Sequence, residues 1–293
     1  MREEEPTLPE GHSLHRLARS LTRSFAGQVV STTSPQGRFV EGAARLDQAV
    51  LTKAEAWGKH LVVTFDEGQL LHVHLGLYGA WVRYSGPVPE PVGALRLRMV
   101  GERYYADLRG PTACELLDPL EVEALYSRLG PDPLRKDADV GAAWARISRS
   151  RAPIGSLLMD QSVIAGIGNV YRAELLYRHG VSPFTEGRSL SQETFLAMWS
   201  DLVMLMKDGV RRGRIVTLDP DDVAAIGELD GDRQAPDDPD LDGGEDTVAR
   251  RRLRRNTGVY VYRRNGRPCL RCGTAIALQE LQGRNLFWCP SCQ

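Results

Sequence analysis

The chain has 293 residues, of which 42% are hydrophobic and 26% are charged, and its formal net charge is −1 at pH 7. This length is sufficient for two domains that each bury a core. No apolar run approaches the roughly 18–20 residues that cross a bilayer, and the first residues lack the apolar segment of a secretion signal. We therefore expect a cytoplasmic protein rather than a membrane or secreted one.

The charged residues are unevenly distributed along the chain. Residues 219–246 contain twelve of the 38 acidic residues but only Arg233 of the 37 basic ones, so 36 basic and 26 acidic residues remain elsewhere. This positive remainder favours binding to a phosphate backbone. The acidic segment is rich in Asp, Gly and Pro, a composition typical of a disordered loop. We expect it to provide solvation; competition with DNA for a basic face is the alternative.

The first predicted element is an amphipathic helix at residues 11–25, where Leu14, Leu21 and Phe25 recur at helical spacing. From about 28 to 118 the pattern changes to short β-rich segments broken by Gly, Pro or charged turns. Strands are expected at residues 60–65, 69–75, 78–84, 95–100 and 103–107. Short strands at such regular spacing predict a β-sandwich.

Leu129-Gly-Pro-Asp-Pro133 indicates a domain boundary. Helices are expected after it, at residues 139–150, 153–164, 169–179 and 190–210. Gly166 and Gly168 permit a tight double turn whose backbone N–H groups, with the start of the next helix, form an anion site. Asn169 begins that helix, and it is either a plain N-cap or a phosphate ligand.

The chain ends with two matched cysteine pairs, Cys269-Leu-Arg-Cys272 and Cys289-Pro-Ser-Cys292. Their spacing predicts a tetrahedral site for one structural zinc ion, with a two-stranded hairpin between the pairs. The hairpin turn would present Arg284 to a negatively charged partner. A zinc knuckle that only staples the end of the chain is the alternative. Cys114 remains unpaired, as expected in a reducing cytoplasm.

Three separated segments of the chain resemble the formamidopyrimidine-DNA glycosylase/endonuclease VIII family. Gly166-Ile-Gly168-Asn169-Val-Tyr171 with Glu174 is similar to its helix–two-turn–helix signature, and the cysteine pairs around Arg284 are similar to its zinc finger. Pro9-Glu10-Gly11-His12 is similar to the mature N-terminus of the family, especially in its endonuclease VIII branch. The resemblance covers residues 9–220 and 255–293.

The resemblance implies an enzyme that flips a damaged base out of DNA, removes it and cleaves the strand. Pro9 would attack the sugar C1′ through its secondary amine, form a Schiff base and drive β- and then δ-elimination. Glu10 would be the adjacent acid/base, and Lys59 would contact the phosphate beside the lesion. Without the resemblance, Glu10 would be an ordinary first-turn helix acid and Lys59 a solvated hairpin lysine.

The same resemblance implies further DNA contacts. Asn169 and Arg284 would bind the DNA backbone together with Lys59. The segment from His72 to Gly79 aligns with the intercalation loop of the family, so Leu77 and Tyr78 would fill the space that the flipped base leaves. Leu77 as a core residue is the alternative.

Two features of the aligned loop need separate interpretation. Gly76 stands where the endonuclease VIII branch often has a longer polar side chain, which is a departure from the family pattern. Two neighbouring histidines, His72 and His74, share one face of a predicted strand. We expect buried or hydrogen-bonding histidines there rather than ligands of a second metal ion.

Pro9 is preceded by residues 1–8, and a proline nitrogen inside a peptide bond is an unreactive amide. We therefore expect that translation begins at the codon read here as Leu8 and that the initiator Met is removed, which would make residues 1–8 a start-site artefact. Proteolytic processing is one alternative, and a DNA-binding protein without catalytic activity is another.

These observations predict an α+β protein with an N-terminal β-sandwich and flanking helix, followed by a helical domain with a helix–two-turn–helix and a zinc-finger hairpin. The expected units are an extension (1–8), a catalytic sandwich (9–132), a DNA-binding helical domain (133–218), an acidic loop (219–249) and a zinc finger (250–293).

The resemblance implies a base-excision-repair glycosylase and abasic-site lyase that removes oxidised pyrimidines from double-stranded DNA. We expect a nucleoid-associated monomer without a nucleotide cofactor. An oxidised-purine glycosylase and a non-catalytic damaged-DNA binder are the alternatives.

Overall fold

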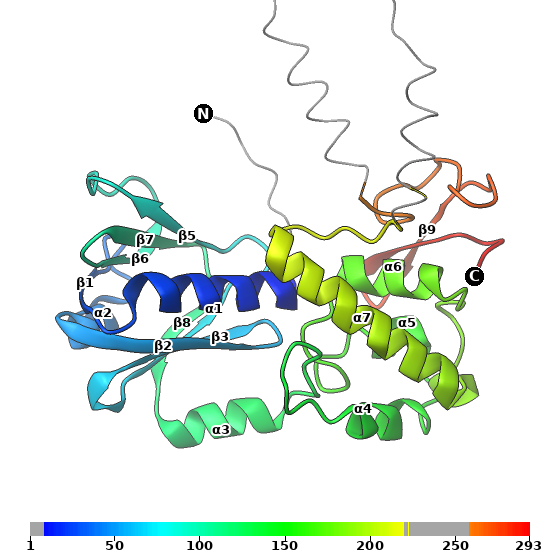
Figure 1. Ribbon diagram of the computed structural model, residues 1–293, viewed down its shortest axis with the longest axis horizontal. Helices are drawn as coiled ribbons and strands as arrows, with labels where there is room; N and C mark the ends of the chain where they lie inside the picture. Colours follow the sequence, from blue (N-terminus) through cyan, green and yellow to red (C-terminus); the bar gives the residue numbers. More distant parts are fainter. Residues whose placement is uncertain (1–8, 220–221, 223–257) are drawn as a thin grey trace, which may run out of the picture.

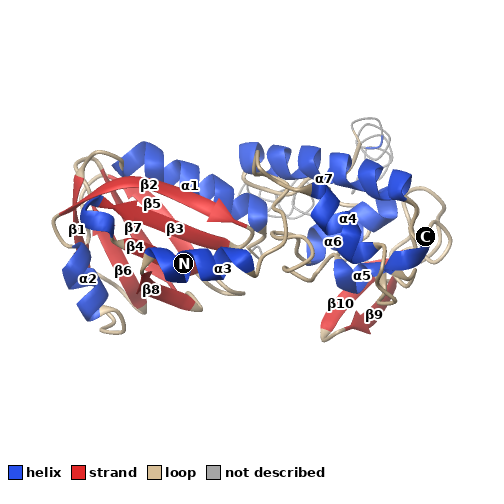
Figure 2. Ribbon diagram, turned by 90° about the horizontal axis from the view of Figure 1, so that it is seen from below, coloured by secondary structure: helices blue, strands red, loops and turns tan. Residues whose placement is uncertain are grey.

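The computed structural model describes residues 9–219, 222 and 258–293. The predicted extension at 1–8 and nearly all of the predicted acidic loop lie outside these residues. Figures 1 and 2 show most of the strands with the first three helices at one end of the molecule, and the helices after residue 139 with a short hairpin at the other.

The helices are α1 (Gly11–Phe25), α2 (Val40–Leu46), α3 (Pro119–Ser127), α4 (Val140–Ile147), α5 (Ile154–Leu157), α6 (Asn169–Arg178) and α7 (Gln192–Arg212). The strands are β1 (Val29–Thr33), β2 (Ala49–Trp57), β3 (His60–Phe65), β4 (Leu70–His74), β5 (Ala80–Ser85), β6 (Leu95–Val100), β7 (Tyr104–Arg109), β8 (Ala113–Leu117), β9 (Ala277–Leu281) and β10 (Arg284–Trp288).

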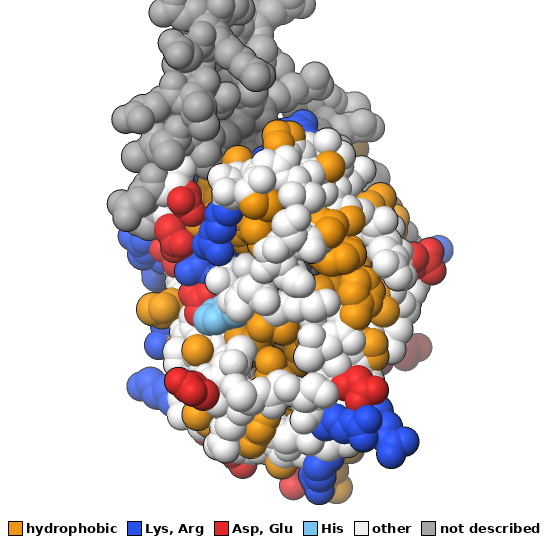
Figure 3. All heavy atoms as spheres, turned by 90° about the vertical axis from the view of Figure 1, so that its right-hand side faces the viewer, with side chains coloured by type: hydrophobic (Ala, Val, Ile, Leu, Met, Phe, Trp, Pro, Cys, Tyr) orange, Lys and Arg blue, Asp and Glu red, His pale blue; other side chains and the backbone are white. Residues whose placement is uncertain are grey.

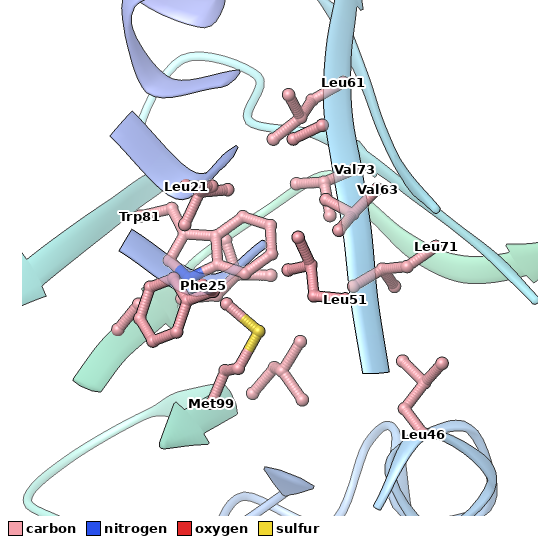
Figure 4. Close-up of a cluster of buried hydrophobic side chains, with 14 of the residues drawn as sticks. Leu21, Phe25, Leu46, Leu51, Leu61, Val63, Leu71, Val73, Trp81 and Met99 are labelled. Atoms are coloured by element: carbon pink, nitrogen blue, oxygen red, sulfur yellow. The ribbon is translucent and has the colours of Figure 1, made fainter. Parts of the chain in front are cut away.

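The N-terminal half is a β-sandwich in the strand order β5-β7-β6-β1-β2-β3-β4-β8. Neighbouring strands are antiparallel, and β1 joins the two four-stranded halves by pairing with both β6 and β2. Their inner side chains form one core with α1, in which Leu21 and Phe25 lie near Trp81 and Met99 of one half and Leu51 of the other (Figure 4). The predicted sandwich with its flanking helix is therefore confirmed.

The second half is helical and has its own core, to which α4, α5, α6 and α7 contribute. A third, smaller core joins α6 to the β9–β10 hairpin and includes Tyr177, Tyr260 and Phe287. The hairpin turn consists of Gln282 and Gly283, both with positive φ, which is the conformation of a tight two-residue turn. The predicted helical domain and finger hairpin are therefore confirmed.

Several predicted limits are confirmed, others differ by one to three residues, and one helix is far shorter than predicted. The helix at 11–25 and the strands at 60–65 and 95–100 have the predicted ends. The helix predicted at 153–164 ends at Leu157. The Gln161 side chain accepts a hydrogen bond from Gly166 N at 2.9 Å and donates one to Ile167 O at 2.9 Å. These bonds stabilise a turn, since they satisfy backbone groups that a continuing helix would pair internally.

The helix α3 was not predicted, although its sequence contains a start signal. Asp118 accepts a hydrogen bond from Glu121 N, while the Glu121 side chain accepts one from Asp118 N, and Pro119 occupies the first turn. This capping box is a typical helix start. Within the described residues, no helix has both the length and the apolar character needed to cross a membrane.

Candidate active site

The Glu10 carboxylate caps helix α6 from the other end of the chain. The N-cap position of α6 is Gly168, which has no side chain to accept the free N–H groups of the first turn. Glu10 accepts hydrogen bonds from Gly168 N at 3.0 Å and from Val170 N at 2.8 Å. The helix start is therefore also the binding site of the Glu10 carboxylate.

This environment changes the acidity of Glu10. The side chain is buried, with 1% of its surface exposed. Burial raises the pKa of Glu10, while the positive charge of Lys59 and the N–H groups of α6 oppose the rise. A raised pKa is the property that lets a carboxyl group both give and take a proton near neutral pH.

Three glycines allow the sandwich and the helical half to meet closely at this point. Gly11 N donates to Gly166 O at 2.8 Å, and a Cβ on Gly11 would approach Gly166 Cα to 2.9 Å. A Cβ on Gly58 would approach Ala165 Cβ to 2.9 Å. Gly166 itself has φ +95°, a conformation that side chains disfavour. Close backbone packing thus brings the start of α1, the β2–β3 turn and the double turn before α6 together.

Lys59 reaches the junction from the β2–β3 turn. The preceding residue, Gly58, donates its N–H to Asp132 Oδ2 at 2.7 Å, and the same oxygen accepts from His15 Nε2 at 2.7 Å. Trp57 Nε1 also donates to the backbone of the segment between the two halves. Burial lowers the pKa of Lys59, and the nearby Glu10 opposes that shift.

Asp132 was predicted only as part of a domain boundary. Its role in holding the β2–β3 turn was missed, because the pattern Gly-Pro-Asp-Pro indicates a turn without showing what the carboxylate contacts. Asp132 is fully buried and also accepts a hydrogen bond from Leu134 N at 2.8 Å.

A cavity of about 290 Å³ opens at this junction. It is lined by Pro9, Glu10, Lys59, His74, Leu75, Gly76, Leu77, Thr112, Met159, Gly168, Asn169 and Arg284. Six of the seven residues predicted for catalysis or DNA contact are in this lining. The seventh, Tyr78, is not, and 78% of its surface is exposed. The structure therefore brings together residues that are dispersed over nearly the whole chain.

Asn169 and Arg284 are linked through a buried arginine. Asn169 Nδ2 donates to Asn285 O at 2.8 Å, and Arg172 donates to the same oxygen at 3.0 Å and to the Asn169 side chain. Arg172 has 1% of its surface exposed. Asn169 is the first residue of α6 rather than its N-cap, so the N-cap alternative is wrong.

The buried Glu174 of α6 binds the backbone of the segment that precedes the zinc finger. Its carboxylate accepts hydrogen bonds from the backbone N–H groups of Tyr260 at 2.7 Å, Val261 at 2.8 Å and Tyr262 at 2.8 Å, and from the Thr217 hydroxyl. These bonds satisfy a charge that is otherwise shielded from water. Arg172 and Glu174 together fix the position of the hairpin whose second strand, β10, begins with Arg284.

The segment around Leu77 projects from the sandwich. Leu77 is 41% exposed and Tyr78 more so, so the core alternative for Leu77 is wrong. Gly76 has φ +69°, and a Cβ there would lie 1.9 Å from Thr112 Oγ1. The threonine hydroxyl therefore occupies the space that a side chain at position 76 would need.

Four thiols at the end of the chain converge on one point. The Sγ atoms of Cys269, Cys272, Cys289 and Cys292 all lie within 4.8 Å of one another. Tyr177 contacts the Cys269 sulfur at 3.0 Å. Four convergent cysteine sulfurs are the donor set of a structural zinc site, so the residues fit the predicted ion. Cys114 is remote from this cluster in the β-sandwich.

Figure 3 shows the end of the molecule farthest from the sandwich. Among the described residues in that view, lysines and arginines are scattered between apolar and acidic side chains. Lys59 and Arg284 instead border the cavity between the two halves.

Comparison with known sequences assigns all three parts of the chain. Residues 8–114 match "Formamidopyrimidine-DNA glycosylase N-terminal domain", residues 129–220 match "Formamidopyrimidine-DNA glycosylase H2TH domain" and residues 266–293 match "Zinc finger found in FPG and IleRS". The chain is 49% identical over 290 residues to Endonuclease 8 1 of Mycobacterium tuberculosis, covering 98% of this chain and 100% of that protein. It is 30% identical over 308 residues to Probable endonuclease 8 2 of Streptomyces coelicolor, covering 98% and 94%.

Solved structures show the same architecture. The MutM (Fpg) protein from Thermus thermophilus superposes with a TM-score of 0.70 at 26% identity, covering 97% of this chain and 98% of that one. Lactococcus lactis Fpg, crystallised with DNA containing an abasic site, shares the fold with a TM-score of 0.73 at 20% identity, covering 97% and 99%. The chain therefore belongs to the formamidopyrimidine-DNA glycosylase/endonuclease VIII family, on its endonuclease VIII side, whose members are bifunctional DNA glycosylases and abasic-site lyases of base excision repair with one structural zinc ion.

Proposed function

We propose that this protein removes oxidised pyrimidines from double-stranded DNA and then cuts the strand by β,δ-elimination, with Pro9 as the nucleophile. The observation that carries the proposal is the shared cavity, in which Pro9, Glu10, Lys59 and Arg284 all take part. A nucleophile, an acid/base group and two cations at one cavity form the set that base removal at a phosphodiester chain requires.

In this mechanism the lone pair of the Pro9 nitrogen forms a bond to the sugar C1′, and the bond from C1′ to the base breaks. The electron pair of that bond leaves with the base, which takes up the proton that the Pro9 nitrogen loses. Glu10 then gives a proton to the sugar O4′ as the ring opens to an iminium ion. A secondary amine produces a cationic iminium without further protonation, which makes the adjacent C2′ proton acidic.

The strand breaks in two successive steps. Loss of the C2′ proton expels the phosphate at C3′, and loss of the C4′ proton expels the phosphate at C5′. Glu10 is the carboxylate adjacent to Pro9, so we assign it the proton transfers at the sugar. Lys59, Asn169 and Arg284 bind the phosphates on either side of the extruded nucleotide, and Leu77 with Tyr78 fills the vacated stack.

The preference for pyrimidines is supported by the relatives rather than by the cavity alone. Several of the more similar proteins are named endonuclease 8, at 49% and 30% identity. Single-turnover cleavage of duplexes with thymine glycol and with 8-oxoguanine tests this preference. Faster cleavage of the 8-oxoguanine duplex would replace the proposal with an oxidised-purine specificity.

The nucleophile is tested by borohydride trapping on abasic-site DNA. The chain that begins at Met1 is compared with a chain whose first residue is Pro9, and intact mass verifies each N-terminus. We expect a covalent adduct only with the chain that begins at Pro9, because only that chain has a free secondary amine. Tight binding to abasic DNA without an adduct from either chain would instead support a non-catalytic binder.

A further inference from the structure

Three histidines and a carboxylate gather on one face of the sandwich, outside the groups that the proposed mechanism uses. The antiparallel register places His60 opposite His74 and His72 opposite Glu115. The sequence shows only His72 and His74 as an alternating pair. The sheet adds His60 from β3 and Glu115 from β8.

The hydrogen bonds in this cluster define the protonation of its central ring. His72 Nδ1 lies 2.9 Å from Glu115 Oε1, and His72 Nε2 lies 3.0 Å from His60 Nδ1. A carboxylate only accepts hydrogen bonds, so His72 donates from Nδ1. In the neutral ring, His72 Nε2 then carries a lone pair that points at His60.

A histidine held in this way by a carboxylate is the arrangement that orients a metal ligand. The carboxylate fixes the tautomer and increases the basicity of the other ring nitrogen. Two imidazole nitrogens that bind one ion at about 2.0–2.1 Å lie about 3.3 Å apart in a tetrahedral site, close to the separation of His60 Nδ1 and His72 Nε2. Burial lowers the pKa of His60 and of His74, so both sites disfavour the charged ring.

We propose that His60, His72 and His74 bind a second divalent transition-metal ion, with Glu115 orienting His72. The ion takes the place of the proton between His60 and His72. The His74 ring centroid lies 4.8 Å from that of His60, so the proposal requires the His74 ring to turn before its nitrogen can reach the ion. With the side chains as they stand, the four cysteines are the only group in the described residues whose candidate ligand atoms converge within 4.8 Å.

The surroundings give an ion both access and charge compensation. The cluster borders an open cleft of about 730 Å³, and α3 forms its opposite wall. Glu115 and Glu121 line the cleft and attract a cation, whereas Arg128 lines it and repels one. Neutral imidazoles with a nearby carboxylate suit Zn²⁺, Ni²⁺ or Co²⁺ rather than Mg²⁺ or Ca²⁺.

The proposed site shares a wall with the catalytic cavity. His74 and Thr112 line both spaces. Thr112 N donates to His74 O at 2.8 Å, and its hydroxyl packs against Gly76 at the start of the intercalation loop. An ion that turns His74 would therefore shift the end of β4, from which the intercalation loop extends.

The test is metal stoichiometry in the full chain without an affinity tag, loaded with one zinc ion and dialysed against Zn²⁺ or Ni²⁺. We expect elemental analysis to give two ions per chain for the wild type and one for His72→Asn. The matched control, His179→Asn, changes a histidine in the helical half that contacts Asp201 and should still give two.

A spectroscopic measurement makes the test independent of how the variants fold. Co²⁺ added to the zinc-loaded wild type should produce the visible bands of nitrogen and oxygen ligands without a thiolate-to-cobalt charge-transfer band. One ion per wild-type chain and no cobalt bands would overturn the proposal. A second ion that persists in both His72→Asn and His60→Asn would also overturn it, since the ion would then be bound elsewhere.

Discussion

The whole sandwich lies between Glu10 and Gly168 in the sequence, yet Gly168 N donates a hydrogen bond of 3.0 Å to the Glu10 carboxylate. The two residues pack so closely that no further atom fits between them. A Cβ on Gly168 would lie 2.4 Å from Glu10 Cδ. The glycine in the signature is thus required by the carboxylate as well as by the turn. This contact couples the start of the catalytic domain to the start of the DNA-binding helix.

Replacing Glu10 with Gln should abolish most of the activity while DNA binding is retained. The amide keeps the shape, but only its oxygen can accept, so one of the bonds from Gly168 N and Val170 N is lost. The amide also cannot exchange a proton with the sugar. We expect abasic-site cleavage to fall about 10²- to 10⁴-fold. Single-turnover kinetics measure this, with the exposed Glu41→Gln as the control. If the cleavage rate stayed within about threefold of wild type, the loss would be far smaller than general acid–base catalysis predicts, and Glu10 would be removed from the mechanism.

Gly168→Ala should damage the site without adding or removing any functional group. The new methyl group displaces the Glu10 carboxylate, so the hydrogen bonds to α6 are weakened. We expect cleavage to fall at least tenfold and the free energy of unfolding to fall by about 1–3 kcal/mol. Gly141→Ala in α4 is the matched control; its Cβ would meet only Asp139 Oδ1, at 3.1 Å, so its effect should be much smaller. Equal behaviour of the two variants would contradict the proposed steric conflict.

Asp132→Ala should lower stability and DNA affinity together. The substitution leaves the N–H groups of Gly58 and Leu134 and the His15 ring without their acceptor in a buried region. Each unsatisfied buried group contributes about 1–3 kcal/mol, so a loss of about 3 kcal/mol is expected. Urea unfolding and binding to abasic DNA measure the two effects. Unchanged affinity in the folded variant would show that the β2–β3 turn holds Lys59 without Asp132.

Stability should fall as the pH is lowered from 6.5 towards 4, with His12 as one cause. Burial lowers the pKa of His12 from its usual 6.5 to about 4, so the folded protein disfavours the charged ring. The unfolded chain binds a proton first, and the stabilisation present above pH 6.5 is lost as the pH decreases to 4. The His12 contribution is about 3 kcal/mol over this interval. In urea unfolding across that range, His12→Phe should show a shallower dependence; an identical slope would refute the assignment.

Removal of zinc should release the finger while the sandwich stays folded. The small core of the finger is shared with α6, and the four thiolates need the ion to offset their mutual repulsion. Chelation, or Cys292→Ala, should reduce affinity for abasic DNA at least tenfold because Arg284 is no longer positioned. Cys114→Ala keeps all four ligands and serves as the control. Circular dichroism monitors the sandwich, and full affinity of the zinc-free protein would show that Arg284 does not contribute.

The local features of this protein could be predicted from its sequence because they depend on neighbouring residues. Helical spacing predicts α1, alternation and turn residues predict β3 and β6, and paired cysteines predict the zinc site. The helix predicted at 153–164 was too long because the Gln161 side chain satisfies a turn, which periodicity does not show.

The tertiary structure alone decided which distant groups meet. Three sets of hydrogen bonds join segments that are far apart in the chain. Glu10 accepts from the start of α6, Asp132 accepts from the turn that carries Lys59, and Arg172 donates to the hairpin backbone. No local pattern records them, since each depends on the packing of two domains and on three glycines that permit close approach. The histidine cluster has the same origin: the strand register adds His60 and Glu115 to a pair that the sequence shows in isolation. Residue types and spacing thus determined the chemistry available, and packing determined which of those groups can act together.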